Sequence, residues 1–296
     1  MNFKKTKFFL AVFTTIIMVF SSTVFGVTKQ GIVYTALGDS IAYGTGATDL
    51  VGYTDLFNEH LNKKLGNEKY FNMSYDGATS EDLLISLNDP FDYFGAQTAI
   101  VASEVITISI GGNDLLGPFL EALGGVVYNF YLNPDYTVDF ESLLADLSEW
   151  ENDLTTHYQF NEMLTGLSSE LPGLVYNFTS NWVIIINRIR ELNPNADIYV
   201  NTVFNPLKFS PRLYQFADPA IQGLNVPIHY FAGIFDYKVV DVYSIFEAYG
   251  NPNRLVVGDL STLAFMVDPD YSGPIPLHPT DMGYKLIFNM HKDLMD

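Results

Sequence analysis

The sequence predicts an α/β domain built on a parallel sheet, and three observations support that prediction. Five short runs are apolar and β-branched without alternation, which is typical of strands covered on both faces. The segments between them space their apolar residues as helices do. No internal repeat, low-complexity tract or linker interrupts the pattern. Because strand and helix alternate, we expect one three-layer α/β/α domain with a five-stranded parallel sheet.

The predicted strands are spread over most of the chain. They are 32–37 (IVYTAL), 70–75 (YFNMSY), 105–110 (VITISI), 197–203 (DIYVNTV) and 238–242 (KVVDV). Helical spacing is clearest over 53–65 and over 282–294. In TSEDLLISL, Thr79 and Asp82 match the capping-box pattern, which places the start of a helix there.

The stretch 118–172 is longer than a crossover between two parallel strands requires, so we interpret it as a helical insertion. Leu143, Leu147, Trp150, Leu154 and Tyr158 fall on about one face of a helix. Two interpretations remain open. The insertion either adds helices packed on the domain or forms a cap over a pocket.

The first 26 residues have the pattern of a secretory signal peptide. A short basic lead, MNFKKTK, precedes an uncharged apolar run, and Val24 and Gly26 occupy the positions that a signal peptidase reads. We predict cleavage after Gly26, secretion, and a single domain over 27–296. An N-terminal membrane anchor facing outside is the alternative, although Thr14, Thr15 and two serines interrupt the run.

The acidic composition and the lack of cysteine limit what this protein can bind. The chain has 15 basic and 34 acidic residues; removing 1–26 leaves 12 basic against 34 acidic, a formal charge of −22. We therefore expect no nucleic-acid partner and no simple attraction to anionic membranes, so that any membrane contact comes through the substrate. The absence of cysteine excludes disulfides and thiolate metal sites. No spacing of histidines and carboxylates indicates a metal, and no glycine pattern indicates a nucleotide cofactor, so we expect neither.

Polar residues gather where the predicted strands end. GDS follows the first strand, DGATS the second and GGND the third, and LHP precedes the last helix. Loops at the carboxyl ends of parallel strands are where open α/β sheets bind ligands. We therefore expect these four segments to meet at one edge of the sheet.

On these segments the sequence resembles the SGNH (GDSL-type) hydrolases. Ser40 in LGDSIAYG, Gly77 in NMSYDGATS, Asn113 in ISIGGNDLL and His278 in LHPTDMGY match the family's four blocks in order. The resemblance implies a flavodoxin-like fold with strand order 2-1-3-4-5. It also implies an esterase or lipase with Ser40 and His278 as the catalytic pair and an oxyanion hole made by the backbone N–H groups of Ser40 and Gly77 and the side-chain amide of Asn113.

The residue types agree with that chemistry. A serine hydroxyl is a weak nucleophile and needs a base within hydrogen-bond reach, usually an imidazole. GDS lacks the second glycine of G-x-S-x-G, since Ala42 stands there, which disfavours the α/β-hydrolase fold. Prolines on both sides of His278 restrict its loop. The remaining histidines fall in helical patterns or in the insertion, where we expect packing or surface roles: His60, His157, His229 and His291.

One position departs from the family pattern. The last block normally has Asp three residues before the histidine, and here that residue is Ile275, which cannot accept a hydrogen bond. Asp268, Asp270 or a backbone carbonyl could orient His278 instead. We therefore expect a Ser-His pair whose third member is displaced or neutral.

The motifs leave the substrate open. The family includes enzymes acting on simple esters, lysophospholipids and acetylated sugars. Apolar residues of the insertion favour an acyl chain and are expected to form one wall of its site: Phe119, Leu120, Val126, Val127, Tyr128, Phe130 and Tyr131. A carbohydrate O-deacetylase and a secreted binding module that has lost catalysis are the alternatives.

Overall fold

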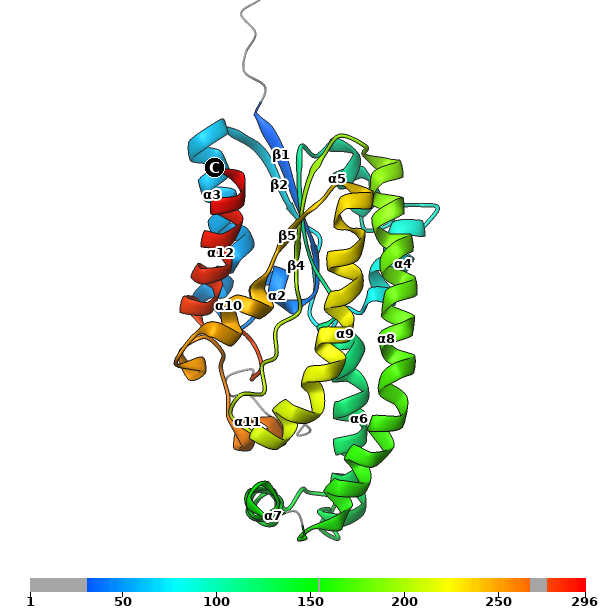
Figure 1. Ribbon diagram of the computed structural model, residues 1–296, viewed down its shortest axis with the longest axis vertical. Helices are drawn as coiled ribbons and strands as arrows, with labels where there is room; N and C mark the ends of the chain where they lie inside the picture. The colour runs from blue at the N-terminus through cyan, green and yellow to red at the C-terminus, as the bar shows by residue number, and fades with distance from the viewer. Residues whose placement is uncertain (1–30, 154, 267–275) are drawn as a thin grey trace, which may run out of the picture. The chain divides into compact units, whose positions relative to one another are not determined.

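A computed structural model describes residues 31–153, 155–266 and 276–296 (Figure 1). The predicted signal peptide 1–26 and the residues Asp268, Asp270 and Ile275 lie outside the described residues. The described chain forms one compact unit, Ile32–Asp296.

The sheet confirms the predicted fold class and strand order. Its strands are β1 (Ile32–Gly38), β2 (Asn67–Asn72), β3 (Val105–Ser109), β4 (Asp197–Asn201) and β5 (Lys238–Val240). They pair in the order β2-β1-β3-β4-β5, and every pair is parallel. The prediction for β2 was displaced by three residues because this edge strand begins with the polar sequence NEK, which an apolar-run criterion misses.

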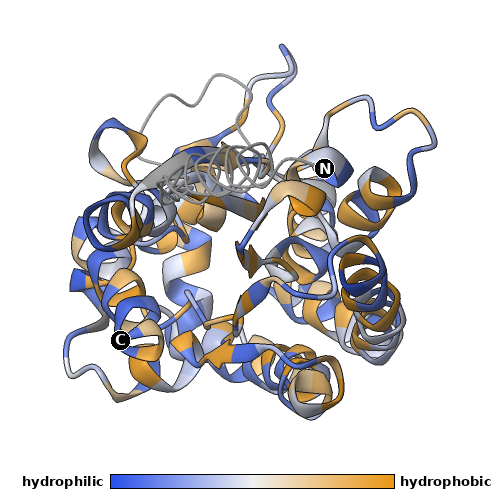
Figure 2. Ribbon diagram, turned by 90° about the horizontal axis from the view of Figure 1, so that it is seen from above, coloured by the Kyte–Doolittle hydropathy of each residue, from blue (hydrophilic) through white to orange (hydrophobic). Residues whose placement is uncertain are grey.

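Helices cover both faces of the sheet, and Figure 2 shows the strands between the two groups. One layer contains α3 (Tyr53–Leu65), α10 (Val242–Ala248) and α12 (Asp281–Met295). The other contains α4 (Ser80–Asn88), α5 (Ala96–Ala102), α8 (Tyr158–Leu192) and α9 (Pro211–Phe235). Alternate strand residues supply each core: Ile106 and Ile108 face the α8 and α9 side, whereas Tyr34 and Tyr199 face the α3 side.

The capping box at the start of α4 is confirmed. The Thr79 side chain accepts a hydrogen bond from the backbone N–H of Asp82, and the Asp82 carboxylate accepts one from the backbone N–H of Thr79. These bonds fix where the chain leaves the loop after β2. That loop contains Gly77, one of the predicted site residues.

The stretch 118–172 begins inside α6 (Gly112–Phe130) and ends inside α8, with α7 (Phe140–Asn152) between them. Leu143, Leu147 and Trp150 are buried on one face of α7, as their spacing predicts. The expected continuation to Tyr158 is wrong, because α7 ends at Asn152 and Tyr158 begins α8 with its side chain exposed. The three helices share a core of their own with α11 (Leu260–Phe265) beyond the carboxyl edge of the sheet (Figure 1).

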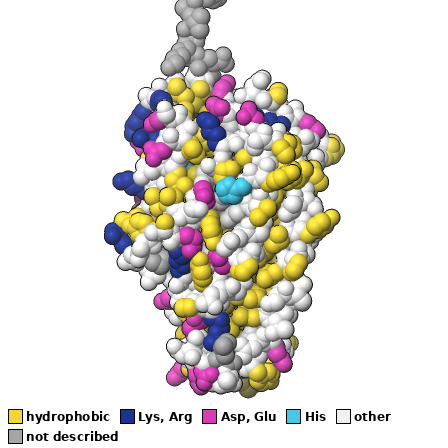
Figure 3. Space-filling model, viewed as in Figure 1, with side chains coloured by type: hydrophobic (Ala, Val, Ile, Leu, Met, Phe, Trp, Pro, Cys, Tyr) yellow, Lys and Arg dark blue, Asp and Glu magenta, His cyan; other side chains and the backbone are white. Residues whose placement is uncertain are grey.

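The outer faces of α8 and α9 carry apolar side chains that the core does not use. Figure 3 shows hydrophobic side chains over these helices on the right of the view. The exposed members include Tyr176, Ile184, Val226, Tyr230 and Ile234. None of the helices within the described ranges has both the length and the apolarity needed to span a membrane.

Candidate active site

Two of the predicted site residues meet although 238 positions separate them in the chain. The Oγ atom of Ser40 lies 2.8 Å from Nε2 of His278, and both side chains are more than nine-tenths buried. Ser40 is the first residue of the short helix α2 (Ser40–Tyr43), directly after β1, and His278 lies in the loop before α12. The distance is that of a hydrogen bond in which the hydroxyl donates to the imidazole.

A backbone carbonyl fixes the tautomer of that imidazole. Nδ1 of His278 lies 2.8 Å from the carbonyl oxygen of Pro276. A carbonyl can only accept, so Nδ1 carries the proton and Nε2 is left as an acceptor for the Ser40 hydroxyl. A backbone carbonyl was among the expected orienting groups. The other two, Asp268 and Asp270, lie outside the described residues.

The His278 loop is held under local strain. Leu277 has φ +69°, a left-handed conformation that is uncommon for a branched residue. Two backbone bonds hold it, since Leu277 N–H donates to the Val257 carbonyl at 2.9 Å and Val257 N–H donates to the His278 carbonyl at 2.8 Å. At Gly46, φ is +91° and a Cβ would lie 2.8 Å from Cβ of His278, so only glycine fits there. Such over-determined strain is common where a catalytic side chain must be aimed.

Asp39 sits beside the serine and caps its helix. Its carboxylate accepts a hydrogen bond from the backbone N–H of Ile41 at 3.0 Å. Burial raises the pKa of Asp39 to about 7, the Ile41 hydrogen bond lowers it, and the carboxylate of Asp114 raises it further.

The two other predicted residues follow β2 and β3, the strands on either side of β1. The Asn113 amide donates one hydrogen bond to the Ala78 carbonyl at 2.9 Å, which leaves its second N–H for another acceptor. Gly77, the residue before Ala78, is exposed with φ +78°, and a Cβ there would meet no atom within 4 Å. Its backbone N–H donates no hydrogen bond within the described part of the chain. A hydrogen bond therefore joins Asn113 to the 77–78 turn. The second N–H of the Asn113 amide and the backbone N–H of Gly77 are both available to another acceptor.

A second set of polar contacts ties this turn to the helices. The Asp114 carboxylate accepts from the backbone N–H of Ser80 at 2.9 Å and also from its hydroxyl. The amide of Asn181, on α8, donates to the Ser80 hydroxyl at 3.0 Å. Burial raises the pKa of Asp114, whereas the Ser80 hydrogen bonds lower it. These hydrogen bonds connect the start of α4 to the start of α6 and to the middle of α8.

Ser40 and His278 open into a cavity of about 120 Å³ whose lining is mostly apolar. The apolar part lies among α6, α8 and α9 and the loop that follows β4. Its lining includes Leu116, Phe119, Leu171, Phe204, Phe216 and Ala217. Cavities of this kind bind the apolar portion of a small molecule beside a few orienting polar groups.

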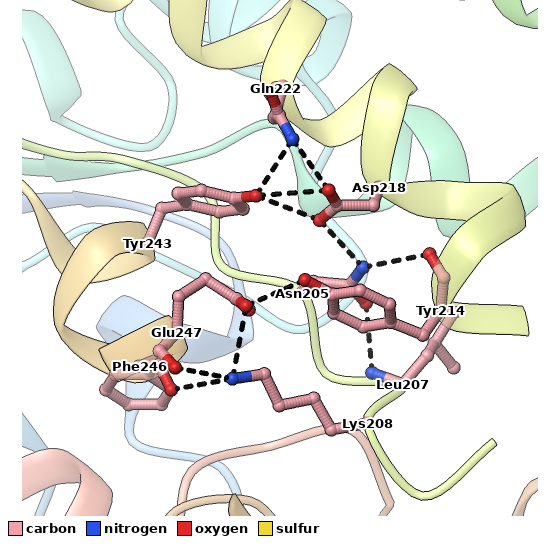
Figure 4. A network of polar contacts seen from close by, with 9 residues as sticks. All are labelled: Asn205, Leu207, Lys208, Tyr214, Asp218, Gln222, Tyr243, Phe246 and Glu247. Carbon is pink, nitrogen blue, oxygen red and sulfur yellow. Dashed lines mark hydrogen bonds and ion pairs between the residues drawn. The ribbon is translucent and has the colours of Figure 1, made fainter. Parts of the chain in front are cut away.

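A polar network holds the loop after β4 that forms part of the wall (Figure 4). The Asn205 amide donates to the Tyr214 carbonyl and to Asp218, and its oxygen accepts from the Leu207 N–H at 3.1 Å. Farther along the loop, Lys208 lies 3.2 Å from Glu247 and also donates to backbone carbonyls of α10. The loop is therefore fixed from both α9 and α10.

Most of the described chain matches a known family of proteins. The model of the GDSL-like lipase/acylhydrolase family matches residues 36–286. The chain belongs to that family. It is accordingly a hydrolase that acts on esters.

Similar proteins agree with the family assignment at the level of the fold. An uncharacterised protein, YpmR, of Bacillus subtilis (strain 168) is 25% identical over 195 residues, 63% of this chain and 73% of that protein. A phospholipase A1 from Streptomyces albidoflavus NA297 matches with a TM-score of 0.55 and 15% identity, over 88% of this chain and 98% of its own. The lipase Lip_vut3 from a goat rumen metagenome matches with a TM-score of 0.53 and 21% identity, over 88% of this chain and 95% of its own.

The predicted acyl wall of this family member needs correction. Phe119 lines the cavity. Leu120, Val126, Val127 and Tyr131 pack instead in the core of the α6–α8 region, and Tyr128 and Phe130 are exposed. The insertion does form part of the wall, but through Phe119 and through Leu167 and Leu171 of α8. The rest of the wall comes from the start of α6, from α9 and from the loop after β4, because the later residues of α6 pack toward α7. Long amphipathic helices give no sequence signal for which part of their apolar face borders a cavity.

Several residues of the site region were not singled out from the sequence. Ser80, Asp114 and Asn181 are polar residues of a helix start or a helix face, where polar side chains are ordinary, so nothing marked them before their contacts were known. The four remaining histidines are absent from the cavity lining. One of them, His291, is fully buried in α12.

Proposed function

We propose that this hydrolase cleaves carboxylic esters through an acyl-enzyme on Ser40. The observation that carries the proposal is the 2.8 Å contact between Ser40 Oγ and His278 Nε2 beside an apolar cavity. In acylation Oγ attacks the ester carbonyl carbon while its proton passes to Nε2. The imidazolium then gives that proton to the departing alcohol. A water molecule repeats the sequence and releases the acid.

The developing oxyanion needs donors set in place before the reaction. We assign this role to the backbone N–H groups of Ser40 and Gly77 and to the free N–H of the Asn113 amide. The hydrogen bond between Asn113 and Ala78 supports the assignment, because it holds the side-chain donor next to the Gly77 turn. The contacts of Asp114 with Ser80 would keep the two segments from moving apart during the reaction.

The apolar lining supports an ester with an acyl chain, of the kind found in lipids and lysophospholipids. A chain of several methylenes would gain about 0.8 kcal/mol per buried CH₂ in the space between Phe119, Leu171 and Phe216. An O-deacetylase would leave this part of the cavity unused. A binding module without catalysis would have no need for the Ser40–His278 contact.

We further propose that the mature protein is secreted after cleavage behind Gly26. The proposal rests on the basic lead and the apolar run of residues 1–26. N-terminal sequencing of the protein from culture medium tests it. Retention of the full chain in a membrane fraction would favour the anchor instead.

The catalytic proposal is tested with the chain 27–296 and the p-nitrophenyl esters of acetate, butyrate and octanoate. The wild type should hydrolyse them with the highest kcat/KM for a chain longer than acetate, and Ser40→Ala should retain no activity above the background. Equal rates for the two proteins would refute the role of Ser40. Activity that peaks at acetate and vanishes by octanoate would favour a deacetylase.

A further inference from the structure

The cavity beside Ser40 has a polar end on the opposite face of the sheet from its apolar part. Val242 and Ile287 line the cavity as well, and both belong to the core between the sheet and α3, α10 and α12. The cavity therefore passes around the carboxyl edge of the sheet. Ser109 and Asn201, which end β3 and β4, lie on that edge.

Strand register places these two side chains next to each other. Ile108 pairs with Val200, so the following residues, Ser109 and Asn201, are neighbours on adjacent parallel strands. Adjacent strands lie about 4.8 Å apart, which brings their side chains within reach of one small ligand group. We call Ser109 and Asn201 the polar end of the cavity.

Asn201 is the unexplained residue of this pair. It is 3% exposed, and neither its amide nitrogen nor its amide oxygen has a partner within hydrogen-bond distance in the described residues. The buried hydroxyl of Tyr53, which also lacks a partner at that distance, lies close enough to Asn201 to affect the pKa of the tyrosine. The Ser109 hydroxyl also makes no hydrogen bond within the described ranges. A buried amide without partners costs more than an apolar side chain of the same shape. The Tyr53 hydroxyl alone cannot satisfy both the nitrogen and the oxygen of this amide.

The other polar residues around the cavity already have roles. Ser40, Asn113 and His278 form the proposed machinery, and Asp39 caps α2. The Thr202 hydroxyl accepts from the Tyr243 N–H at 2.9 Å and lies 3.3 Å from Asp241. Among the cavity-lining residues that the structure describes, Ser109 and Asn201 are therefore the ones whose polar groups have no assigned role.

The chemistry of the polar end restricts what can bind. An amide and a hydroxyl together offer donors and acceptors but no charge. The cavity lining contains no lysine or arginine in the described part of the chain, and the carboxyl group of Asp39 lines it, so an anion is disfavoured. A neutral group that both donates and accepts fits, and the smallest such group is a hydroxyl.

We propose that Ser109 and Asn201 form a subsite for a hydroxyl group of the ester substrate. The proposal rests on the proposed function and adds to it that the preferred ester is hydroxylated, in its acyl chain or in its alcohol. A substrate hydroxyl forms hydrogen bonds with the Asn201 amide, whereas an analogue without that hydroxyl leaves the amide buried without them. Such sites discriminate strongly against the analogue.

The experiment compares hydroxylated with plain esters as ratios of kcat/KM. For the acyl side the substrates are p-nitrophenyl 2-hydroxyhexanoate, 3-hydroxyhexanoate and hexanoate; for the alcohol side they are glycerol monobutyrate and methyl butyrate. The wild type should prefer at least one hydroxylated ester by about 10-fold, and Asn201→Leu should abolish that preference. Hydrolysis of plain hexanoate by the wild type tests the proposed function separately, so the two failures are distinguishable.

Asn225→Leu is the matched control, because Asn225 is also a buried asparagine but is fully paired with the backbone of Val203. It should lower the melting temperature and leave the preference intact. If Asn201→Leu does not fold, Ser109→Ala carries the test and should reduce the preference by several-fold. A wild type without any hydroxyl preference, or a preference that survives in both variants, would overturn the proposal and leave the polar end to resident water.

Discussion

Nδ1 of His278 lies 2.8 Å from the carbonyl oxygen of Pro276, two residues earlier in the same loop. The carbonyl selects the tautomer in which Nε2 faces Ser40, which is the orienting part of what a triad aspartate does. It offers only a dipole to the imidazolium that forms during the reaction, whereas an aspartate offers a full negative charge. The Pro276 carbonyl therefore supplies orientation and no net charge.

A carboxylate introduced three residues before His278 should add charge stabilisation. We expect Ile275→Asp to raise kcat by about 10-fold, a small part of the roughly 10⁴-fold contribution of a triad aspartate, because the tautomer is already set. Asp268→Asn and Asp270→Asn should each change kcat by less than about 10-fold, measured with p-nitrophenyl butyrate. A loss of about 10³-fold in either variant would instead identify that carboxylate as the displaced third member.

Asn113 should act on turnover more than on binding. Asn113→Ala removes one oxyanion donor, so kcat should fall by about 10²- to 10³-fold with little change in KM. Asn129→Ala is the matched control, since Asn129 lies exposed on the same helix and only donates to the Gly125 carbonyl. An increase in KM at unchanged kcat would contradict the assigned role.

Asp114 and Ser80 should behave as one unit. We expect Asp114→Ala and Ser80→Ala each to lower kcat, because each removes the bond between the Ser80 hydroxyl and Asp114 that helps to tie the turn carrying Gly77 to the start of α6. The loss should be about 10-fold for Asp114→Ala and smaller for Ser80→Ala, in which the backbone N–H of residue 80 still donates to Asp114. The double variant should be no slower than the Asp114 variant alone, since losing Asp114 already removes the contact that Ser80→Ala breaks. Independent, multiplied losses in kcat would show that the two side chains act separately.

The sequence predicted the sheet because apolar strand runs are local signals, whereas the strand order and the pairing of Ser40 with His278 were implied by the resemblance to the SGNH hydrolases. The sequence misplaced β2, whose polar start lies at the sheet edge, and it named the wrong residues of the insertion, apart from Phe119, as the cavity wall. Contacts such as Asn181 with Ser80 join residues 101 positions apart and depend on how α8 crosses the sheet. The unpaired amide of Asn201 is likewise visible only once the surrounding residues have been placed.

The far part of the cavity should set the acyl-chain length. Ala217 lines it from α9, and a phenylalanine there would fill space that a chain needs. We expect Ala217→Phe to lower kcat/KM for p-nitrophenyl octanoate by about 10-fold and leave that for acetate within 2-fold. Val226→Phe on the exposed face of α9 is the control and should change neither. Equal losses on both esters would mean that the chain does not reach Ala217.

Stability at acid pH should depend on His291. Its ring is fully buried, with the Tyr53 ring centred 4.8 Å away, and its Nδ1–H donates to the Ile287 carbonyl at 3.0 Å. Burial lowers its pKa to about 4, whereas the hydrogen bond to Ile287 raises it. The folded protein thus binds fewer protons than the unfolded chain between about pH 4 and 6.5. Its free energy of unfolding should fall by about 3 kcal/mol as the pH drops through that range.

Asp39 changes the stability in the opposite direction as the pH falls. Its raised pKa makes the folded state bind more protons than the unfolded chain between about pH 4 and 7, so its contribution to the free energy of unfolding increases toward acid pH. The measurement is therefore the difference in free energy of unfolding between His291→Phe and the wild type, at pH 7.5 and at pH 4.5, in which the Asp39 contribution cancels. Phenylalanine keeps the ring packing and removes the proton-binding site. The variant should gain about 2 to 3 kcal/mol relative to the wild type on going to the lower pH. A difference that does not change with pH would mean that His291 takes up no proton on unfolding.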